Sequence, residues 1–91
     1  MTACSITIVN ALGLHARAAA RFVHTASSFV SRISVRKGDR VVDGKSIMGL
    51  LLLAASHGSV IDITADGPDE AEASQALCAL ITRGFDEASC V

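Results

Sequence analysis

Apolar residues recur along the chain with two different spacings. An alternation of apolar and polar residues predicts a half-buried strand, whereas an apolar residue every three to four positions predicts an amphipathic helix. The strand pattern occurs in residues 5–9, 32–36, 41–42 and 59–66, and the helical pattern occurs in residues 16–27, 47–57 and 68–83. The predicted order of elements is therefore β-α-β-β-α-β-α.

The first predicted helix, residues 16–27, has one apolar and one basic side. Its apolar side consists of Ala19, Phe22, Val23 and Ala26. Arg17, Arg21 and His24 follow one another at spacings of four and three residues, which places them together on the opposite side. We expect the apolar side to be buried and the basic side to face solvent.

Start and stop residues bound the later elements. Residues 37–39, Lys-Gly-Asp, separate two strand patterns and predict a hairpin turn. Ser46 is the predicted N-cap of the second helix, Gly58 follows its predicted end, and His57 would lie near the C-terminal carbonyls, where a cation is favourable. The third helix is predicted to start near Pro68 with three acidic residues and to end before Gly84. Its apolar stripe consists of Ala73, Leu77, Leu80 and Ile81.

This order predicts a single domain, residues 1–91, of the α/β (α+β) class. Helices that follow alternating strands favour a two-layer sandwich, in which helices cover one face of an antiparallel sheet and the other face is solvated. Many unrelated activities share such a layout, so function has to be argued from particular residues.

Composition narrows the class of protein. Hydrophobic residues make up 51% of the 91 residues, which is enough for a packed core. The three cysteines, Cys4, Cys78 and Cys90, are odd in number and far apart, so we expect reduced thiols in a cytoplasmic protein, with Cys78 buried. No secretory signal is expected, and the apolar run at residues 47–55 is too short to span a membrane.

Charge is segregated along the chain. Residues 1–45 hold seven Lys+Arg and two acids, a balance of +5, whereas residues 46–91 hold one arginine and seven acids, a balance of −6. The segregation fits either two ordinary solvated surfaces or a basic region that attracts an anionic group or an acidic partner. A nucleic-acid-binding module is disfavoured by the acidic second half and by the absence of Trp and Tyr.

His15 is the first candidate for chemistry. It precedes the predicted helix that begins at Ala16, where unpaired backbone N–H groups and the helix dipole favour an anion and a neutral imidazole. A neutral imidazole can attack phosphorus, and the guanidinium of Arg17 suits phosphoryl oxygens. A purely structural alternative, with His15 as a helix cap and Arg17 as a solvated residue, is equally compatible with the sequence.

Ser46 is the second candidate. The sequence Gly44-Lys45-Ser46 is not a nucleotide-binding loop, because Asp39 stands where that motif requires its first glycine. A simple N-cap is the favoured interpretation, and phosphorylation is the functional alternative, since it would add about −2 charge beside apolar residues. His24 and His57 show no metal-ligand spacing and are expected on the surface, and the run Leu50–Leu53 is expected to be mainly core, with one or two residues exposed at an interface.

Three segments in this order resemble the HPr family, the histidine-containing phosphocarriers of the phosphoenolpyruvate-dependent phosphotransferase system. They are GLHARAAARFV (residues 13–23), GKSIMGLLLLAA (44–55) and DGPDEAEA (66–73), and the resemblance extends over about residues 5–87. It implies an open-faced β-sandwich with a four-stranded antiparallel sheet in the order 1-4-2-3 and three helices on one face.

The resemblance also implies roles for individual residues. His15 would accept a phosphoryl group on Nδ1 from phosphorylated enzyme I, with phosphoenolpyruvate as the donor, and pass it to a histidine of an enzyme IIA protein. Arg17 would stabilise the phosphate, and Ser46 matches a residue that an HPr kinase/phosphorylase modifies in many relatives. The implied docking patch is Ile47, Met48 and Leu51. No cofactor, metal, nucleic acid or membrane insertion is expected.

One residue departs from the family pattern. Ala18 occupies the position of the proline in the usual GLHARP motif. Counted from His15 as the N-cap, this is the third helical position, whose N–H has no partner within the helix, so alanine and proline both fit. We expect phosphoryl transfer through His15 to survive the change.

Two other functions remain compatible with the sequence. One is a regulatory, nitrogen-related branch of the same system, in which the phosphoryl group reaches a regulatory enzyme IIA and no sugar is transported. The other is a small enzyme that acts on acyl phosphates with Arg17 as its phosphate clamp; it is disfavoured because no second acid or base has a matching spacing.

Overall fold

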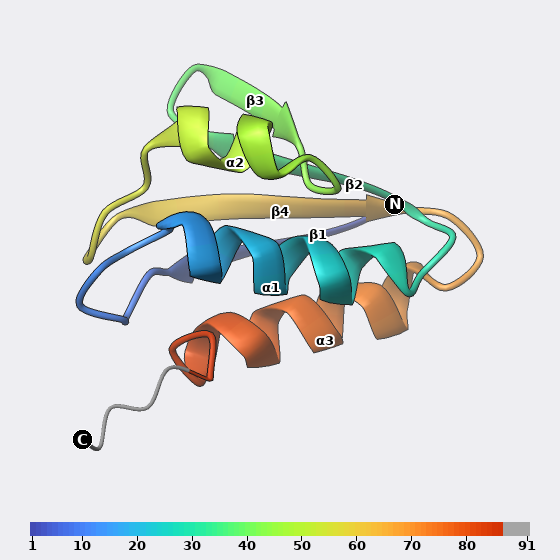
Figure 1. Ribbon diagram of the computed structural model, residues 1–91. Helices are drawn as coiled ribbons and strands as arrows, with labels where there is room; N and C mark the ends of the chain where they lie inside the picture. Colours follow the sequence, from blue (N-terminus) through green and yellow to red (C-terminus); the bar gives the residue numbers. More distant parts are fainter. Residues whose placement is uncertain (87–91) are drawn as a thin grey trace.

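The computed structural model describes residues 1–86 and contains seven elements in the predicted order (Figure 1). They are β1 Thr2–Thr7, α1 Ala16–Ser27, β2 Arg32–Lys37, β3 Arg40–Asp43, α2 Ile47–Leu53, β4 Val60–Asp66 and α3 Glu70–Thr82. The four strands form one antiparallel sheet in the order β1-β4-β2-β3. This architecture confirms the predicted open-faced sandwich with helices on one face.

The core lies between the helices and the sheet. In β4, Ile61, Ile63 and Ala65 are buried, while the residues between them point toward the open face, as the alternation predicted. In register with them, Ile6 pairs with Ile61 and Val35 with Ile63. Central pairs of this kind bury branched side chains on one face and so fix the strand register.

Both long helices turn their predicted apolar sides inward. In α1 the buried residues are Ala18, Ala19, Phe22 and Ala26, and in α3 the predicted stripe is fully enclosed. Alanine brings the helix backbones close to the sheet, and Phe22 fills the remaining volume; full burial of such a ring contributes on the order of 2 to 3 kcal/mol. Gly84, with φ +70, follows the C-cap residue of α3 as predicted.

The first strand begins earlier than its sequence pattern indicated. It was predicted for residues 5–9 but extends from Thr2 to Thr7, because its residues pair with β4 from Ala65 back to Val60. Ile8 lies just beyond the strand and is buried, so its predicted inward orientation is correct.

The second helix ends four residues before the predicted position. It stops at Leu53 because Ala54 adopts a left-handed conformation, with φ 55° and ψ 40°. The carbonyls of Leu52 and Ala54 accept hydrogen bonds from Arg40 and Lys37, which flank the β2–β3 turn, at 2.7 and 3.3 Å. The predicted roles of Gly58 as terminator and of His57 as a helix-end cation are therefore wrong, and His57 is exposed in the following loop.

The left-handed Ala54 provides a stability test. A left-handed conformation costs a non-glycine residue roughly 1 to 2 kcal/mol, and Ala54 is exposed, so its methyl group contributes little packing. We expect Ala54→Gly to raise the free energy of unfolding by about 1 kcal/mol in urea titrations. The same change at exposed Ala20, inside α1, should lower it by about 1 kcal/mol. Equal signs for the two variants would contradict the conformational explanation.

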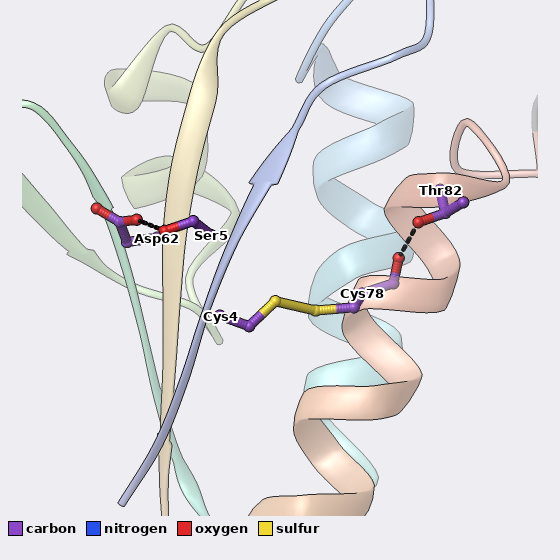
Figure 2. The surroundings of a disulfide bond; sticks show 5 residues. All are labelled: Cys4, Ser5, Asp62, Cys78 and Thr82. Atoms are coloured by element: carbon purple, nitrogen blue, oxygen red, sulfur yellow. Dashed lines mark hydrogen bonds between the residues drawn. A yellow bond between two sulfur atoms is a disulfide. The ribbon is translucent and has the colours of Figure 1, made fainter.

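A disulfide joins Cys4 of β1 to Cys78 of α3 (Figure 2). The prediction of reduced thiols is therefore wrong for this pair, and Cys78 is a half-buried disulfide partner instead of a buried thiol. A separation of 74 residues concealed the pairing, since the two cysteines meet only when α3 packs beside the edge strand β1. Cys90 lies outside the described residues.

Asp69 connects the start of α3 to the loop before β2. Its carboxylate accepts hydrogen bonds from the Ser31 hydroxyl and from the backbone N–H groups of Val30 and Ser31, the last two at 3.0 Å. The Ser31 hydroxyl is the main cause of a lowered pKa for the Asp69 carboxyl, and the two N–H groups lower it further. The Asp69 side chain therefore links the start of α3 to the loop before β2 and does not cap its own helix.

The lowered pKa of Asp69 predicts acid sensitivity. Because the folded-state pKa lies below the ordinary value of 3.8, ionised Asp69 stabilises the fold fully above pH 3.8, and this contribution disappears as the pH falls through the lower folded-state pKa. We expect the urea midpoint to decrease from pH 5 toward pH 2, and to decrease less steeply in Ser31→Ala. A wild-type slope in that variant would show that other carboxylates dominate.

Candidate functional site

The loop before α1 is held by main-chain contacts. Gly13 has φ +66°, and a Cβ at this position would approach the Ala55 carbonyl oxygen to 2.7 Å and the Ser56 Cα to 2.8 Å. The Leu14 N–H donates to the Ala55 oxygen at 2.8 Å, and the side-chain amide of Asn10 donates to the Gly13 oxygen at 2.7 Å. Glycine is required both for the backbone conformation and for the close approach, so the position of His15 is determined by the loop after α2.

His15 is the N-cap of α1, as predicted. Its backbone is extended, its carbonyl accepts from the Ala19 N–H at 2.8 Å, and its Nδ1 accepts from the Arg17 N–H at 3.3 Å. Because an N–H donates to Nδ1, this nitrogen acts as an acceptor with its lone pair toward the helix end. The side chain is half-buried, so a reagent from solvent can reach the ring.

Arg17 supplies two kinds of donor. Its backbone N–H faces His15 Nδ1, while its exposed guanidinium lies on the outer side of α1. An anion attached to the imidazole would thus meet the positive end of the helix dipole and a permanent cation. Ala18, the residue that departs from the usual motif, is fully buried in the first turn of α1.

Ser46 caps the neighbouring helix. Its hydroxyl oxygen accepts from the Gly49 N–H at 3.0 Å, which confirms the predicted N-cap. The side chain is half-buried, and α2 packs against α1. Leu14 bonds to Ala55 after α2, whereas Lys45 Nζ, before α2, donates to the Phe29 carbonyl oxygen after α1 at 2.7 Å. His15 and Ser46 therefore cap opposite ends of the helix pair.

An exposed apolar patch follows Ser46 along α2. Of the predicted docking residues, Met48 is 67% exposed and Ile47 and Leu51 are also exposed. Sequence analysis did not single out Leu52, which is 61% exposed, or Leu12, which is 71% exposed in the loop before His15. The helical spacing 47, 48, 51 and 52 was the available signal for Leu52, since Leu50 and Leu53 face the core.

Other kinds of site find no support in residues 1–86. No three His, Cys, Asp or Glu side chains in this part of the chain are grouped so that they could hold a metal ion. None of its helices has the length and apolar character needed to cross a membrane. The arrangement around His15 is best suited to holding a covalently attached anion.

Comparison with known proteins decides the family. Residues 2–83 match the PTS-HPr model, described as the PTS HPr component phosphorylation site. The chain belongs to the HPr family. It is therefore a phosphocarrier protein of the phosphotransferase system, as the sequence motifs indicated.

Relatives of this HPr chain match it over nearly their whole length. The phosphocarrier protein HPr of Neisseria meningitidis is 57% identical over 91% of this chain and 93% of the relative. The phosphocarrier protein NPr of Shewanella violacea is 42% identical over 92% of each chain. A crystal structure of HPr from Thermoanaerobacter tengcongensis superimposes with a TM-score of 0.92 and 49% identity, over 96% of this chain and 98% of that one.

Proposed function

We propose that His15 accepts a phosphoryl group from phosphorylated enzyme I, supplied by phosphoenolpyruvate, and transfers it to a histidine of an enzyme IIA protein. The observation that supports this role is the hydrogen bond between His15 Nδ1 and the Arg17 N–H at the start of α1. It supports Nδ1 as the accepting nitrogen, because its lone pair needs only to leave the Arg17 N–H, which can then serve the incoming group.

The transfer step balances at this nitrogen. The Nδ1 lone pair forms a bond to phosphorus as the bond from phosphorus to the donor breaks. The donor keeps that electron pair and takes up a proton, while the imidazole releases its Nε2 proton, so both groups end neutral. The Arg17 N–H, which donated to Nδ1, then donates to a phosphoryl oxygen, and the Arg17 guanidinium adds its charge. The same N–H therefore donates in both the unmodified and the phosphorylated protein. The phosphorylated form gains little extra stability from it, so the phosphoryl group can be passed on, as a carrier requires.

Partner docking is assigned to the apolar residues of α2 and the basic side of α1. Ile47, Met48 and Leu51 offer exposed apolar area on α2, and Arg17 and Arg21 of the adjacent helix favour acidic partner faces. A donor and an acceptor have to use this surface in turn, so each complex should be short-lived.

Transfer is tested with labelled phosphoenolpyruvate, magnesium and enzyme I. The protein should acquire label that is lost in acid and retained in alkali, as expected for phosphate linked to nitrogen, and purified enzyme IIA should then remove it. Label that survives acid, or label that no enzyme IIA accepts, would contradict the proposed relay.

Phosphorylation of Ser46 is the proposed means of regulation, with an HPr kinase/phosphorylase as the modifying partner. A phosphate at this N-cap would place negative charge beside Ile47 and Met48 and repel an acidic partner face. We expect Ser46→Asp to slow transfer from enzyme I by about tenfold or more. Ser46→Asn is the matched control because it keeps a capping oxygen without charge; equal rates for the two variants would leave Ser46 as a cap alone.

A further inference from the structure

A groove between α1 and α3 carries an unusual number of cations. The two helices lie side by side on the sheet (Figure 1), and between their outer faces is a hollow of about 540 Å³. Arg17, Arg21 and His24 of α1 line one side, and Arg83, the C-cap residue of α3, lines the other. Three arginines from two helices thus line one small volume.

The part of the groove formed by residues 1–86 also includes apolar residues and one acid. Leu80 and Ala20 form part of its lining. Asp86 is the acid, and its carboxylate pairs with the Arg83 Nε at 2.7 Å. Among the described lining residues, three arginines against one aspartate give a balance of +2 when His24 is neutral.

Two of the arginines are held in place before any ligand arrives. Arg21 Nη1 donates to the Phe85 carbonyl oxygen, and Arg83 is fixed by its two contacts with Asp86. Guanidinium groups that are already ordered lose less side-chain freedom on binding. The Nε and Nη2 donors of Arg83 bind Asp86, so a ligand would meet the remaining Nη1 donors of that side chain. The groove is therefore suited to binding one small anion at a defined position, in addition to attracting salt ions nonspecifically.

We propose that this groove binds a phosphate monoester with a compact uncharged body, of about the size of a mononucleotide. Phosphate oxygens match the donors of arginine, and the exposed methyl group of Ala20 offers apolar contact to the body of the ester. A volume of about 540 Å³ lies within the range of small-molecule sites.

The groove is coupled to His15 through Arg17. If His15 carries a phosphoryl group, as proposed above, that group adds about −2 charge beside the Arg17 N–H and draws the guanidinium away from the groove. The ester should then bind more weakly to the phosphorylated carrier. Linkage requires the reciprocal effect, so bound ester disfavours the phosphorylated state by the same factor. This coupling rests on the proposed function, whereas binding to the unphosphorylated protein does not.

Binding is tested by nuclear magnetic resonance titration of the unphosphorylated protein with AMP. We expect saturable shifts of amide and arginine side-chain signals in residues 17–25 and 80–86. Adenosine, which lacks the phosphate, and inorganic phosphate, which lacks the body, should each bind at least about tenfold more weakly. Shifts spread over all basic residues, or no saturation at millimolar AMP, would overturn the proposal.

Variants separate the groove from net charge. Arg83→Gln should weaken AMP binding about tenfold, and Asp86→Asn should strengthen it severalfold, because it removes the one acid. Arg32→Gln removes the same charge from β2, where the neighbouring Ile33 faces the core and Arg32 the open side, and should leave affinity unchanged. Equal losses in Arg83→Gln and Arg32→Gln would overturn the site. Failure of AMP binding with intact labelling of His15 would leave the proposed relay standing.

Discussion

Replacement of His15 by asparagine is expected to reduce phosphoryl labelling from enzyme I to background while the protein remains folded. Asparagine has no nucleophilic ring nitrogen, yet it is among the best N-cap residues and can accept from the N–H groups at the start of α1. His15→Ala should also lose labelling, but with an additional loss of about 0.5 to 2 kcal/mol in stability because the cap is removed. The assay measures acid-labile label per mole of protein.

The other two histidines provide the controls for His15. His24 lies on the exposed side of α1, and His57 lies in the loop after α2. His24→Asn and His57→Asn should both retain full stoichiometric labelling. Undiminished labelling in His15→Asn, or complete loss in either control, would show that the phosphoryl group is carried elsewhere.

Reduction of the disulfide between Cys4 and Cys78 should lower the free energy of unfolding by about 4 kcal/mol. The estimate follows from the loop that the bond closes, since linking residues 74 positions apart removes much of the freedom of the unfolded chain. Urea titrations with and without a reductant measure the difference. The effect is large because the bond ties β1, which lies at the edge of the sheet, to the last described helix.

Single-cysteine variants test whether this pair is responsible. Cys4→Ser and Cys78→Ser should each match the reduced wild-type protein, and neither should respond further to reductant. Cys90→Ser should behave as oxidised wild type in the absence of reductant. If Cys78→Ser were as stable as the oxidised protein, the bond would contribute nothing to the fold.

Local patterns were sufficient for most of the fold. The bounds of α1 agree with the prediction because an N-cap, an apolar side and a basic side all indicate the same segment. The two-residue turn between β2 and β3 and the inward side of β4 also follow from signals a few residues long. Such signals act within one element and do not depend on its neighbours.

The errors all involve contacts between distant residues. The Cys4–Cys78 bond depends on α3 reaching β1, and the early end of α2 depends on cations from the β2–β3 turn. The first three residues of β1 pair because β4 extends beside them, although their own pattern is weak. The spacing of residues along the sequence does not directly predict any of these contacts between distant segments.

The candidate site was easier to predict than the surface around it. His15 and Ser46 cap their helices as expected, because capping is a local property of short polar or aromatic side chains. The exposure of Leu12 and the groove that Arg17 shares with Arg83 required the packed structure. Motifs therefore predicted the capping residues of the candidate site, whereas the surface around them could be described only from the packed structure.

The close approach of Gly13 to residues 55–56 has a consequence for how one carrier can serve several proteins. Since the Leu14 N–H is bonded to the Ala55 oxygen, the backbone itself sets the distance between the imidazole and α2, independently of the side chains around them. Any protein that binds α2 in the same way would meet the proposed accepting nitrogen of His15 at the same position. Because this distance is fixed, unrelated partners can evolve separately. Each partner needs only to keep the same distance between its own surface that binds α2 and its own histidine.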